Sequence, residues 1–277
     1  MNLKVEPIKP AVGAILTTDR TTLLNDPQIA QRCMELVEQH GVVVFPRLGL
    51  SDEEQLALTD KLGARVNFTT SAPGSSRAGG YTISLDPKLN AEPEYVLGTF
   101  FYHMDGMAMD GIPPPKASVL ACRKTAPKGG QTEFASTYAA YEALSAEEKA
   151  EYENLRVIHT VTAGVREVCS PEEIEPRKRA RHAERPLVWT HASGRKSLLI
   201  GYTADTVVGL SKAEGRALLM RLLEWAGQPA FTYRHYWQEG DLVIWDNCGA
   251  LHRVIPYAAD SGRNMNRTSV AGTEMLA

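Results

Sequence analysis

Apolar and polar residues alternate at helical spacing early in the chain and then give way to a short apolar run. Ile29, Cys33, Leu36 and Val37 lie on one face of a helix predicted over Pro27–His40. Asp26 is suited to cap the start of this helix, and Gly41 to end it. The β-branched run that follows at 42–45 is typical of a strand buried on both faces. An opening strand is expected around residues 12–16.

A second helix and a long irregular stretch follow. Ser51 and Glu54 form a capping-box pattern that predicts the start of a helix, and Gly63 predicts its end. Residues 68–94 are rich in Gly, Ser, Pro and Asn, which indicates long loops around at most one strand at 81–85. Loops of this length near reacting groups often act as lids.

The remainder of the chain is dominated by short apolar segments separated by glycine turns. Strands are predicted at 117–122, 156–162, 187–191, 197–202, 231–235, 241–246, 250–257 and 264–270. Helices are predicted only at 138–155, with a restart at Ser145, and at 212–225. This pattern predicts a mainly β fold, a double-stranded β-helix (jelly roll) with flanking helices. We expect one domain over 1–277, with an inserted helical and charged segment at about 138–186.

Residues 172–185 form a dense run of charges of both signs. Such a run is usually a solvated insertion, and that is the interpretation we favour. The alternatives are a docking surface or an arginine that reaches the substrate.

Composition excludes several classes of protein. The 277 residues carry 30 Lys and Arg against 33 Asp and Glu, so the net charge of −3 argues against a nucleic-acid partner. No apolar stretch reaches the roughly 18 residues of a membrane span, and the first 16 residues lack the apolar core of a secretory signal. Four widely spaced cysteines form no CxxC pair, which predicts reduced thiols and a cytoplasmic location.

Two stretches carry metal-competent side chains within apolar sequence. His103 and Asp105 are two positions apart, so in a strand they would point to the same face. His252 follows the strand predicted at 241–246 and a tight turn. Two imidazoles and one carboxylate form the ligand set of non-haem iron(II) oxygenases, which leaves three coordination positions open. Taken alone, a His-x-Asp pair arises by chance, and a histidine beside aromatic residues is more often a hydrogen-bonded core residue.

Two arginines near the C-terminus add an anion-binding element. Arg263 and Arg267 would share one face of the last predicted strand, with Met265 between them. A guanidinium group can hold a carboxylate through two parallel hydrogen bonds, as a diacid cosubstrate would require. The alternative is a strand face that simply meets water.

Several segments, in order, resemble the family of taurine dioxygenase and 2,4-dichlorophenoxyacetate dioxygenase. The matching segments are HMD at 103–105, PPPKASVL at 113–120, PKGGQT at 127–132, YAAYEALS at 138–145, GRKSL at 194–198, GDLVIWDN at 240–247, HR at 252–253 and GRNMNR at 262–267. The resemblance implies an iron(II)- and 2-oxoglutarate-dependent dioxygenase on a jelly-roll core, with O2 as the second cosubstrate. It also implies hydroxylation of a small anionic organic substrate, with or without cleavage, and release of succinate and CO2. A homo-oligomer is expected, because members of this family commonly form dimers or tetramers.

The resemblance assigns roles by position. It implies three iron ligands, which are His103, Asp105 and His252. Thr132 and Arg263 would hold the distal carboxylate of 2-oxoglutarate, whereas Arg267 would lie near the metal and contact the cosubstrate or an anionic substrate. Trp245 and Asp246 would shape the wall beside the distal histidine.

Substrate choice is expected to reside in two places, the loop at 68–81 and the stretch at 106–111. Met107 and Met109 could line an adaptable apolar pocket, although packing is the more usual role of such residues. Members of the family that use taurine carry a histidine well before the His-x-Asp motif, and residues 65–70 contain none. Taurine is therefore not the expected substrate.

Two other classes of function remain open from the sequence. A zinc hydrolase could use the same triad with a bound water, but it would leave Thr132 and the two arginines without a role. A non-catalytic barrel could bind an anion through Arg263 and Arg267. Dependence of turnover on O2 and 2-oxoglutarate separates both from the oxygenase.

Overall fold

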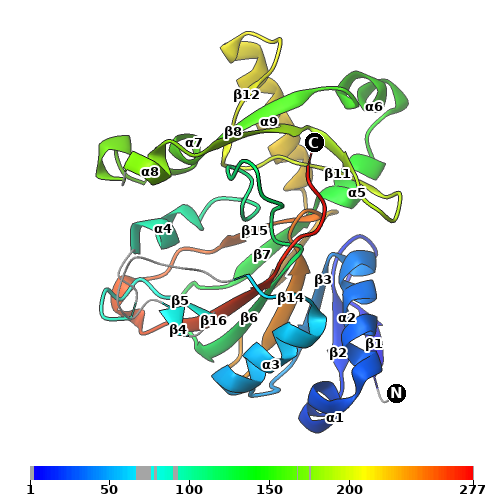
Figure 1. Cartoon of the computed structure of the whole chain (residues 1–277), viewed down its shortest axis with the longest axis vertical. Helices are drawn as coiled ribbons and strands as arrows, with labels where there is room; N and C mark the ends of the chain where they lie inside the picture. The colour runs from blue at the N-terminus through cyan, green and yellow to red at the C-terminus, as the bar shows by residue number, and fades with distance from the viewer. Residues whose placement is uncertain are drawn as a thin grey trace.

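Two facing β-sheets form the centre of the fold, seen in the computed structural model in Figure 1. The structure describes residues 3–66, 76–77, 80–89, 93–166, 168–174 and 176–276. The larger sheet has the spatial order β1 (Lys4–Pro7), β2 (Ala14–Thr17), β3 (Val42–Phe45), β14 (Leu242–Asp246), β6 (Ala117–Lys124), β16 (Asn264–Val270), β5 (Gly80–Ile83) and β4 (Ser76–Arg77). The smaller sheet has the order β13 (Thr232–His235), β7 (Thr132–Ser136) and β15 (Ala250–Val254).

Side chains of the larger sheet point alternately to its two faces, so the apolar residues of one strand pack in two different cores. In β14, Val243 and Trp245 point between the two sheets, where they pack with Phe134 of β7. Leu242 and Ile244 point to the opposite face. Because successive side chains of a strand alternate, one strand contributes to two cores at once. The mainly β jelly roll with flanking helices is confirmed.

Three helices cover the outer face of the larger sheet, α1 (Arg20–Asn25), α2 (Pro27–His40) and α3 (Asp52–Leu62). The predicted caps are confirmed, since the side chain of Asp26 accepts from Gln28 N and Ser51 forms a reciprocal capping box with Glu54. Gly41 adopts φ of 72° where α2 ends, a conformation that glycine tolerates best.

An upper layer packs on the outer face of the smaller sheet (Figure 1). It contains α5 (Thr137–Glu142), α6 (Ala146–Tyr152), β8 (Arg156–Thr160), α7 (Val161–Val165), η1 (Pro171–Glu173), α8 (Pro176–Arg179), β9 (His182–Pro186), β10 (Val188–Thr190), β11 (Lys196–Leu198), β12 (Ala204–Val207) and α9 (Lys212–Ala226). The short α4 (Pro93–Gly98) and η2 (Ala259–Ser261) flank the barrel. Within the described residues, no helix is both long and apolar enough to cross a membrane.

Several local predictions need correction. The restart predicted at Ser145 within 138–155 is confirmed, since Ser145 accepts from Glu148 N and caps a new helix, but the second helix ends at Tyr152. The strand expected at 156–162 ends at Thr160, whose hydroxyl caps α7 by accepting from Ala163 N. Strands β1, β4, β7, β9 and β12 were not predicted. Because β4 precedes β5, the expectation of at most one strand within 68–94 is wrong. Residues 68–75, 78 and 79 of the expected substrate loop lie outside the described residues.

The charged run at 172–185 is mostly exposed, but its last arginine is not. Arg185 lies in β9 with 2% of its surface exposed. Its guanidinium donates to the carbonyl oxygens of Met107 at 3.2 Å and Leu276 at 3.4 Å, and also to that of Met109. Arg185 therefore ties the segment after Asp105 to the C-terminal tail, and the interpretation of the run as solvated is wrong at this residue.

Replacing Arg185 tests this tie. Arg185→Met would leave buried carbonyl groups without donors, so we expect the free energy of unfolding to fall by about 2–4 kcal/mol. The control is Arg181→Met in the same charged run, where the side chain is exposed. Chemical denaturation should show a change within about 0.5 kcal/mol for the control. Equal losses in both variants would contradict the assignment.

Candidate functional site

A tight turn at 247–249 carries the chain from β14 of the larger sheet to β15 of the smaller sheet, and β15 brings His252 to the space between the sheets. Along β15, Ala250 packs in the core between the two sheets. Leu251 points to the other side, into the core between the smaller sheet and the upper layer. His252 returns to the inner side by strand alternation, and its ring lies 4.7 Å from that of Trp245. Trp245 thus lies beside this histidine and is also part of the apolar core between the sheets.

A pair of backbone hydrogen bonds docks His103 against His252. His103 N donates to His252 O at 3.1 Å, and His252 N donates to His103 O at 3.0 Å. This is an isolated antiparallel bridge, and Asp105 lies in the turn that follows it. The expectation that His103 and Asp105 share a strand is wrong, because the chain turns away after a single bridged residue.

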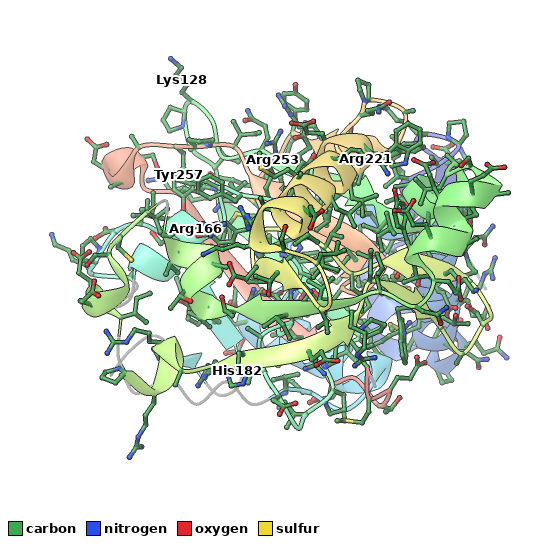
Figure 2. The ribbon with its side chains drawn as sticks, turned by 90° about the horizontal axis from the view of Figure 1, so that it is seen from above. Lys128, Arg166, His182, Arg221, Arg253 and Tyr257 are labelled. Atoms are coloured by element: carbon green, nitrogen blue, oxygen red, sulfur yellow. The ribbon has the colours of Figure 1, made fainter. Side chains whose placement is uncertain are left out.

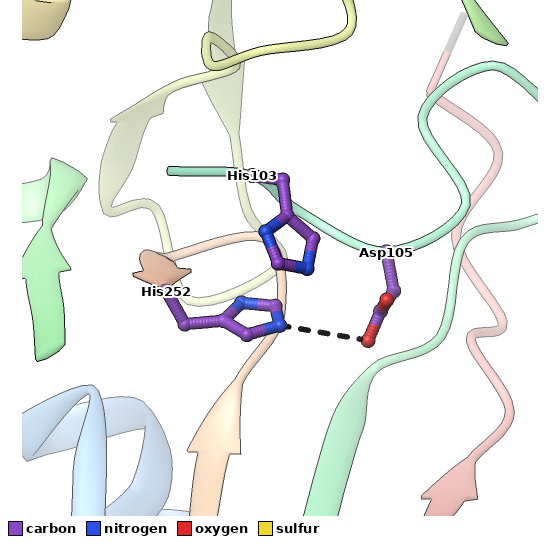
Figure 3. A group of neighbouring side chains, drawn as sticks. All are labelled: His103, Asp105 and His252. Atoms are coloured by element: carbon purple, nitrogen blue, oxygen red, sulfur yellow. Dashed lines mark ion pairs between the residues drawn. The ribbon is translucent and has the colours of Figure 1, made fainter. Parts of the chain in front are cut away.

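The three side chains nonetheless converge (Figure 3). The imidazole centroids of His103 and His252 are 4.1 Å apart, and His252 Nε2 lies 3.8 Å from Asp105 Oδ2. One potential ligand atom from each residue lies within 4.8 Å of the others. Nδ1 of His103 is 2.8 Å from Phe101 O, and since a carbonyl only accepts, Nδ1 must donate. Nε2 of His103 is thereby left as a lone-pair donor for a metal.

Electrostatics favour the protonation states that bind a divalent cation. Burial lowers the pKa of both imidazoles, so they are neutral. Burial alone would raise the pKa of Asp105, but the guanidinium charge of Arg267 is the largest effect that lowers it, and the pKa lies well below its usual range. Nη1 of Arg267 lies 3.0 Å and 3.1 Å from the two Asp105 oxygens, and Ser118 Oγ donates to Oδ2 at 3.2 Å. Two neutral imidazoles and one carboxylate fit an iron(II) site with open positions.

Arg263 forms a separate anion-binding element. It is 2% exposed, its Nε donates to Gly130 O at 3.3 Å, and its guanidinium carbon lies 4.7 Å from the centroid of the Tyr257 ring. Its Nη1 has no hydrogen-bond partner within the described part of the chain. A buried cationic N–H group without an acceptor is costly, so this position suits a carboxylate.

Thr132 lies two residues after Gly130 and is also buried. Its hydroxyl oxygen accepts from Trp237 Nε1 at 2.9 Å, which leaves the hydroxyl proton available to an anion. Trp237 was not predicted as a site residue, because the sequence gives no sign that its strand end meets β7.

One expectation changes and one is confirmed. Asp246 does not face His252, since its Oδ2 accepts from Tyr138 Oη at 3.0 Å and from Lys116 Nζ at 3.3 Å. Met107 is 1% exposed and packs in the core of the upper layer, so the packing role favoured for it is confirmed.

An outer network braces the segment before His103. Tyr102 Oη donates to Glu133 Oε2 at 2.9 Å, and Arg253 Nε donates to the same oxygen at 2.8 Å. Arg234 donates to the other oxygen of Glu133 at 2.8 Å. Figure 2 shows Arg253 beside helix α9, and the residues that line a cleft of about 460 Å³ include Arg253 together with α9 side chains. The network thus fixes the outer sides of β7 and β15, opposite the inner side that carries His252.

Comparisons of the sequence with known proteins match one protein family. A model of the taurine catabolism dioxygenase TauD, TfdA family matches residues 4–269. The chain is 34% identical to the alpha-ketoglutarate-dependent 2,4-dichlorophenoxyacetate dioxygenase of Cupriavidus pinatubonensis, over 97% of this chain and 98% of that protein. It is 30% identical to the (S)-phenoxypropionate/alpha-ketoglutarate-dioxygenase of Sphingobium herbicidovorans, over 97% and 94%.

Solved structures of related proteins have the same overall fold. The crystal structure of AAD-2 in complex with Mn(II) and N-oxalylglycine superposes with a TM-score of 0.84 at 30% identity, covering 100% of both chains. A structure described as a putative alpha-ketoglutarate dependent 2,4-D dioxygenase from Burkholderia xenovorans gives 0.80 at 29% identity, covering 98% of each chain.

Gly201 offers a test of how tightly His103 is held. Its φ is +116°, and an added Cβ would lie 2.9 Å from Tyr102 O and 3.3 Å from His103 Cα. Gly194 also has a positive φ, but a Cβ there would meet nothing within 4 Å. We expect Gly201→Ala and Gly194→Ala each to lose about 1–2 kcal/mol of stability from backbone strain.

Only Gly201→Ala should also displace His103, and we expect its affinity for Mn(II) to fall about tenfold or more. Titration calorimetry with Mn(II) on both folded variants measures the difference. Unchanged affinity in Gly201→Ala would show that the backbone beside His103 tolerates displacement.

Proposed function

We propose roles for the site residues on the premise that this chain belongs to the taurine catabolism dioxygenase TauD, TfdA family and is a 2-oxoglutarate-dependent dioxygenase. Its cofactor is iron(II), and 2-oxoglutarate and O2 are its cosubstrates. The observation that carries the assignment is the convergence of His103, Asp105 and His252. These three residues would hold the iron. The hydrolase and the non-catalytic barrel are set aside by the family.

Bound iron(II) supplies the oxidative chemistry, in which one atom of O2 enters the substrate and the other enters succinate. The protein contributes three ligands on one side, which leaves room for 2-oxoglutarate, O2 and a neighbouring substrate. Asp105 stays ionised and the imidazoles stay neutral, so no proton must leave before the metal binds.

Arg263 and Thr132 would hold the distal carboxylate of 2-oxoglutarate. The open Nη1 of Arg263 and the proton of the Thr132 hydroxyl supply two donors for it. Because this anchor is buried among apolar residues, it would fix the depth of the cosubstrate. Arg267 contacts Asp105, and we propose that it balances the charge of that ligand and lies beside the cosubstrate or substrate.

For the substrate we propose a small organic anion, with aryloxyalkanoic acids first. The two relatives above are named for 2,4-dichlorophenoxyacetate and (S)-phenoxypropionate, and a third, 24% identical, is named a sulfate ester dioxygenase. Hydroxylation of a carbon that bears an ether or sulfate oxygen gives a product that falls into two fragments. A substrate of this class would therefore be cleaved.

We also propose that the whole chain acts as one unit in the cytoplasm, as part of a homo-oligomer. A single apolar cluster joins the upper layer to the smaller sheet, which supports one folding unit. The four cysteines are free thiols, which suits a reducing compartment.

The substrate class is tested by substrate-stimulated release of succinate with iron(II), 2-oxoglutarate and air. We expect aryloxyalkanoates to stimulate release above sulfonates and sulfate esters, and taurine to have no effect. His103→Ala should abolish release with every compound, since one imidazole ligand is lost. A sulfonate or sulfate ester as the best substrate would overturn the proposed substrate class, and activity without O2 would overturn the reaction.

The cosubstrate anchor is tested at Arg263. Arg263→Met should raise KM for 2-oxoglutarate about 100-fold or more, because a charged hydrogen bond is worth about 1.5–3 kcal/mol and burial adds to it. Arg234→Met is the control, since Arg234 bonds to Glu133 on the outer side of the sheet. Initial rates at varied 2-oxoglutarate give both constants. A similar KM in the two variants would exclude Arg263 as the anchor.

A further inference from the structure

Asn247 is a wholly buried polar residue in the turn between β14 and β15. Its side-chain Oδ1 accepts from Asp105 N at 2.8 Å, and its Nδ2 donates to Asp105 O at 2.8 Å. Nδ2 also donates to Pro115 O at 3.1 Å, and the backbone N donates to Lys116 O at 3.0 Å. The side chain of Asn247 thus bonds to both backbone polar groups of Asp105, the N–H and the C=O.

This arrangement matches an amide to the donor and acceptor of Asp105. An asparagine side chain offers one acceptor and two donor protons, and here all three functions are used. Aspartate would place an oxygen against the carbonyls of Asp105 and Pro115, and it could not donate to either. Serine would be too short to reach both sides. The contact therefore requires an asparagine, and it fixes the backbone from which the Asp105 carboxylate projects.

The position of Asn247 gives the contact a further consequence. Asn247 lies five residues before His252, in the turn that connects β14 to β15, and His252 is bridged to His103 by two backbone hydrogen bonds. The short segment 247–252 therefore supplies His252, holds His103 through its backbone, and holds Asp105 through a side chain. Within the described residues, the side chain of Asn247 bonds to both the N–H and the C=O group of Asp105.

We propose that Asn247 is a positioning residue that sets the place and direction of the Asp105 carboxylate for metal binding. The inference rests on the proposed function, in which Asp105 is a metal ligand. Residues that orient a ligand typically contribute about 10–100-fold to metal affinity. Asn247 would act in this way through the backbone of the ligand rather than through its carboxylate.

The experiment measures the Kd of Co(II) by its visible absorption in folded protein, with Asn247→Ser and Asn247→Asp as the variants. Asn247→Ser removes the contact without adding charge. Asn247→Asp keeps the shape of the side chain but replaces the NH2 donor with an oxygen that can only accept. The matched control is Asp241→Asn, at the other end of β14. Asp241 is also buried and accepts three hydrogen bonds, from Arg47 N, His235 Nε2 and Gln238 N.

We expect both Asn247 variants to bind Co(II) about 10–100-fold more weakly and with an altered spectrum, because the carboxylate is misplaced. Asp241→Asn should lose thermal stability with its Co(II) affinity within twofold of wild type. If one Asn247 variant does not fold, as judged by circular dichroism, the other decides. Wild-type affinity in a folded Asn247→Ser protein would overturn the inference.

A parallel titration of Asp105→Ala separates this failure from failure of the proposed function. If wild type and Asp105→Ala bind Co(II) equally, Asp105 is not a ligand and the proposed site is wrong. If Asp105→Ala alone loses affinity while the Asn247 variants keep it, the site stands and only the positioning role is excluded.

Discussion

The backbone bridge between His103 and His252 is the constraint on which the site depends. The chain around His103 belongs to no strand, so nothing in its own local structure would hold it against the barrel. Two reciprocal hydrogen bonds join it to the middle of β15 and bring the two imidazoles to a centroid distance of 4.1 Å. Because these bonds join backbone groups, they fix the positions of His103 and His252 whatever side chains lie next to them. The position of the candidate metal site is consequently set by β15 rather than by the loop that carries His103 and Asp105.

The buried and half-buried carboxylates near the site pair with different arginines. Asp105 pairs with Arg267 at the metal end, and Arg263 is buried deeper, beside Gly130 and Tyr257. The outer carboxylate, Glu133, is fully engaged by Arg253 and Arg234. A diacid cosubstrate would meet the one buried guanidinium whose Nη1 lacks an acceptor in the described residues. Under the proposed function, this separation would give the cosubstrate a direction, with the keto acid end at the metal and the far carboxylate at Arg263.

Local sequence patterns predicted much of this fold, because the signals they use are local. Caps at Asp26 and Ser51 define helices through contacts two or three residues away, and period-two alternation identifies buried strands such as β14. The site residues were predicted through a family resemblance and a ligand set. The roles of Arg185 and Asn247 were not predicted, because they depend on hydrogen bonds to carbonyl groups that lie 76 to 142 positions away in the sequence. Residue type alone does not distinguish such a buried arginine or asparagine from an exposed one.

The most direct test is a crystal structure of the protein with Mn(II) in place of iron, with the metal located by its anomalous scattering. The account predicts one strong peak bonded to Nε2 of His103, a carboxylate oxygen of Asp105 and Nε2 of His252, at about 2.0–2.3 Å from each. A peak bonded to other residues, or bonded to only one of the two imidazoles, would contradict it.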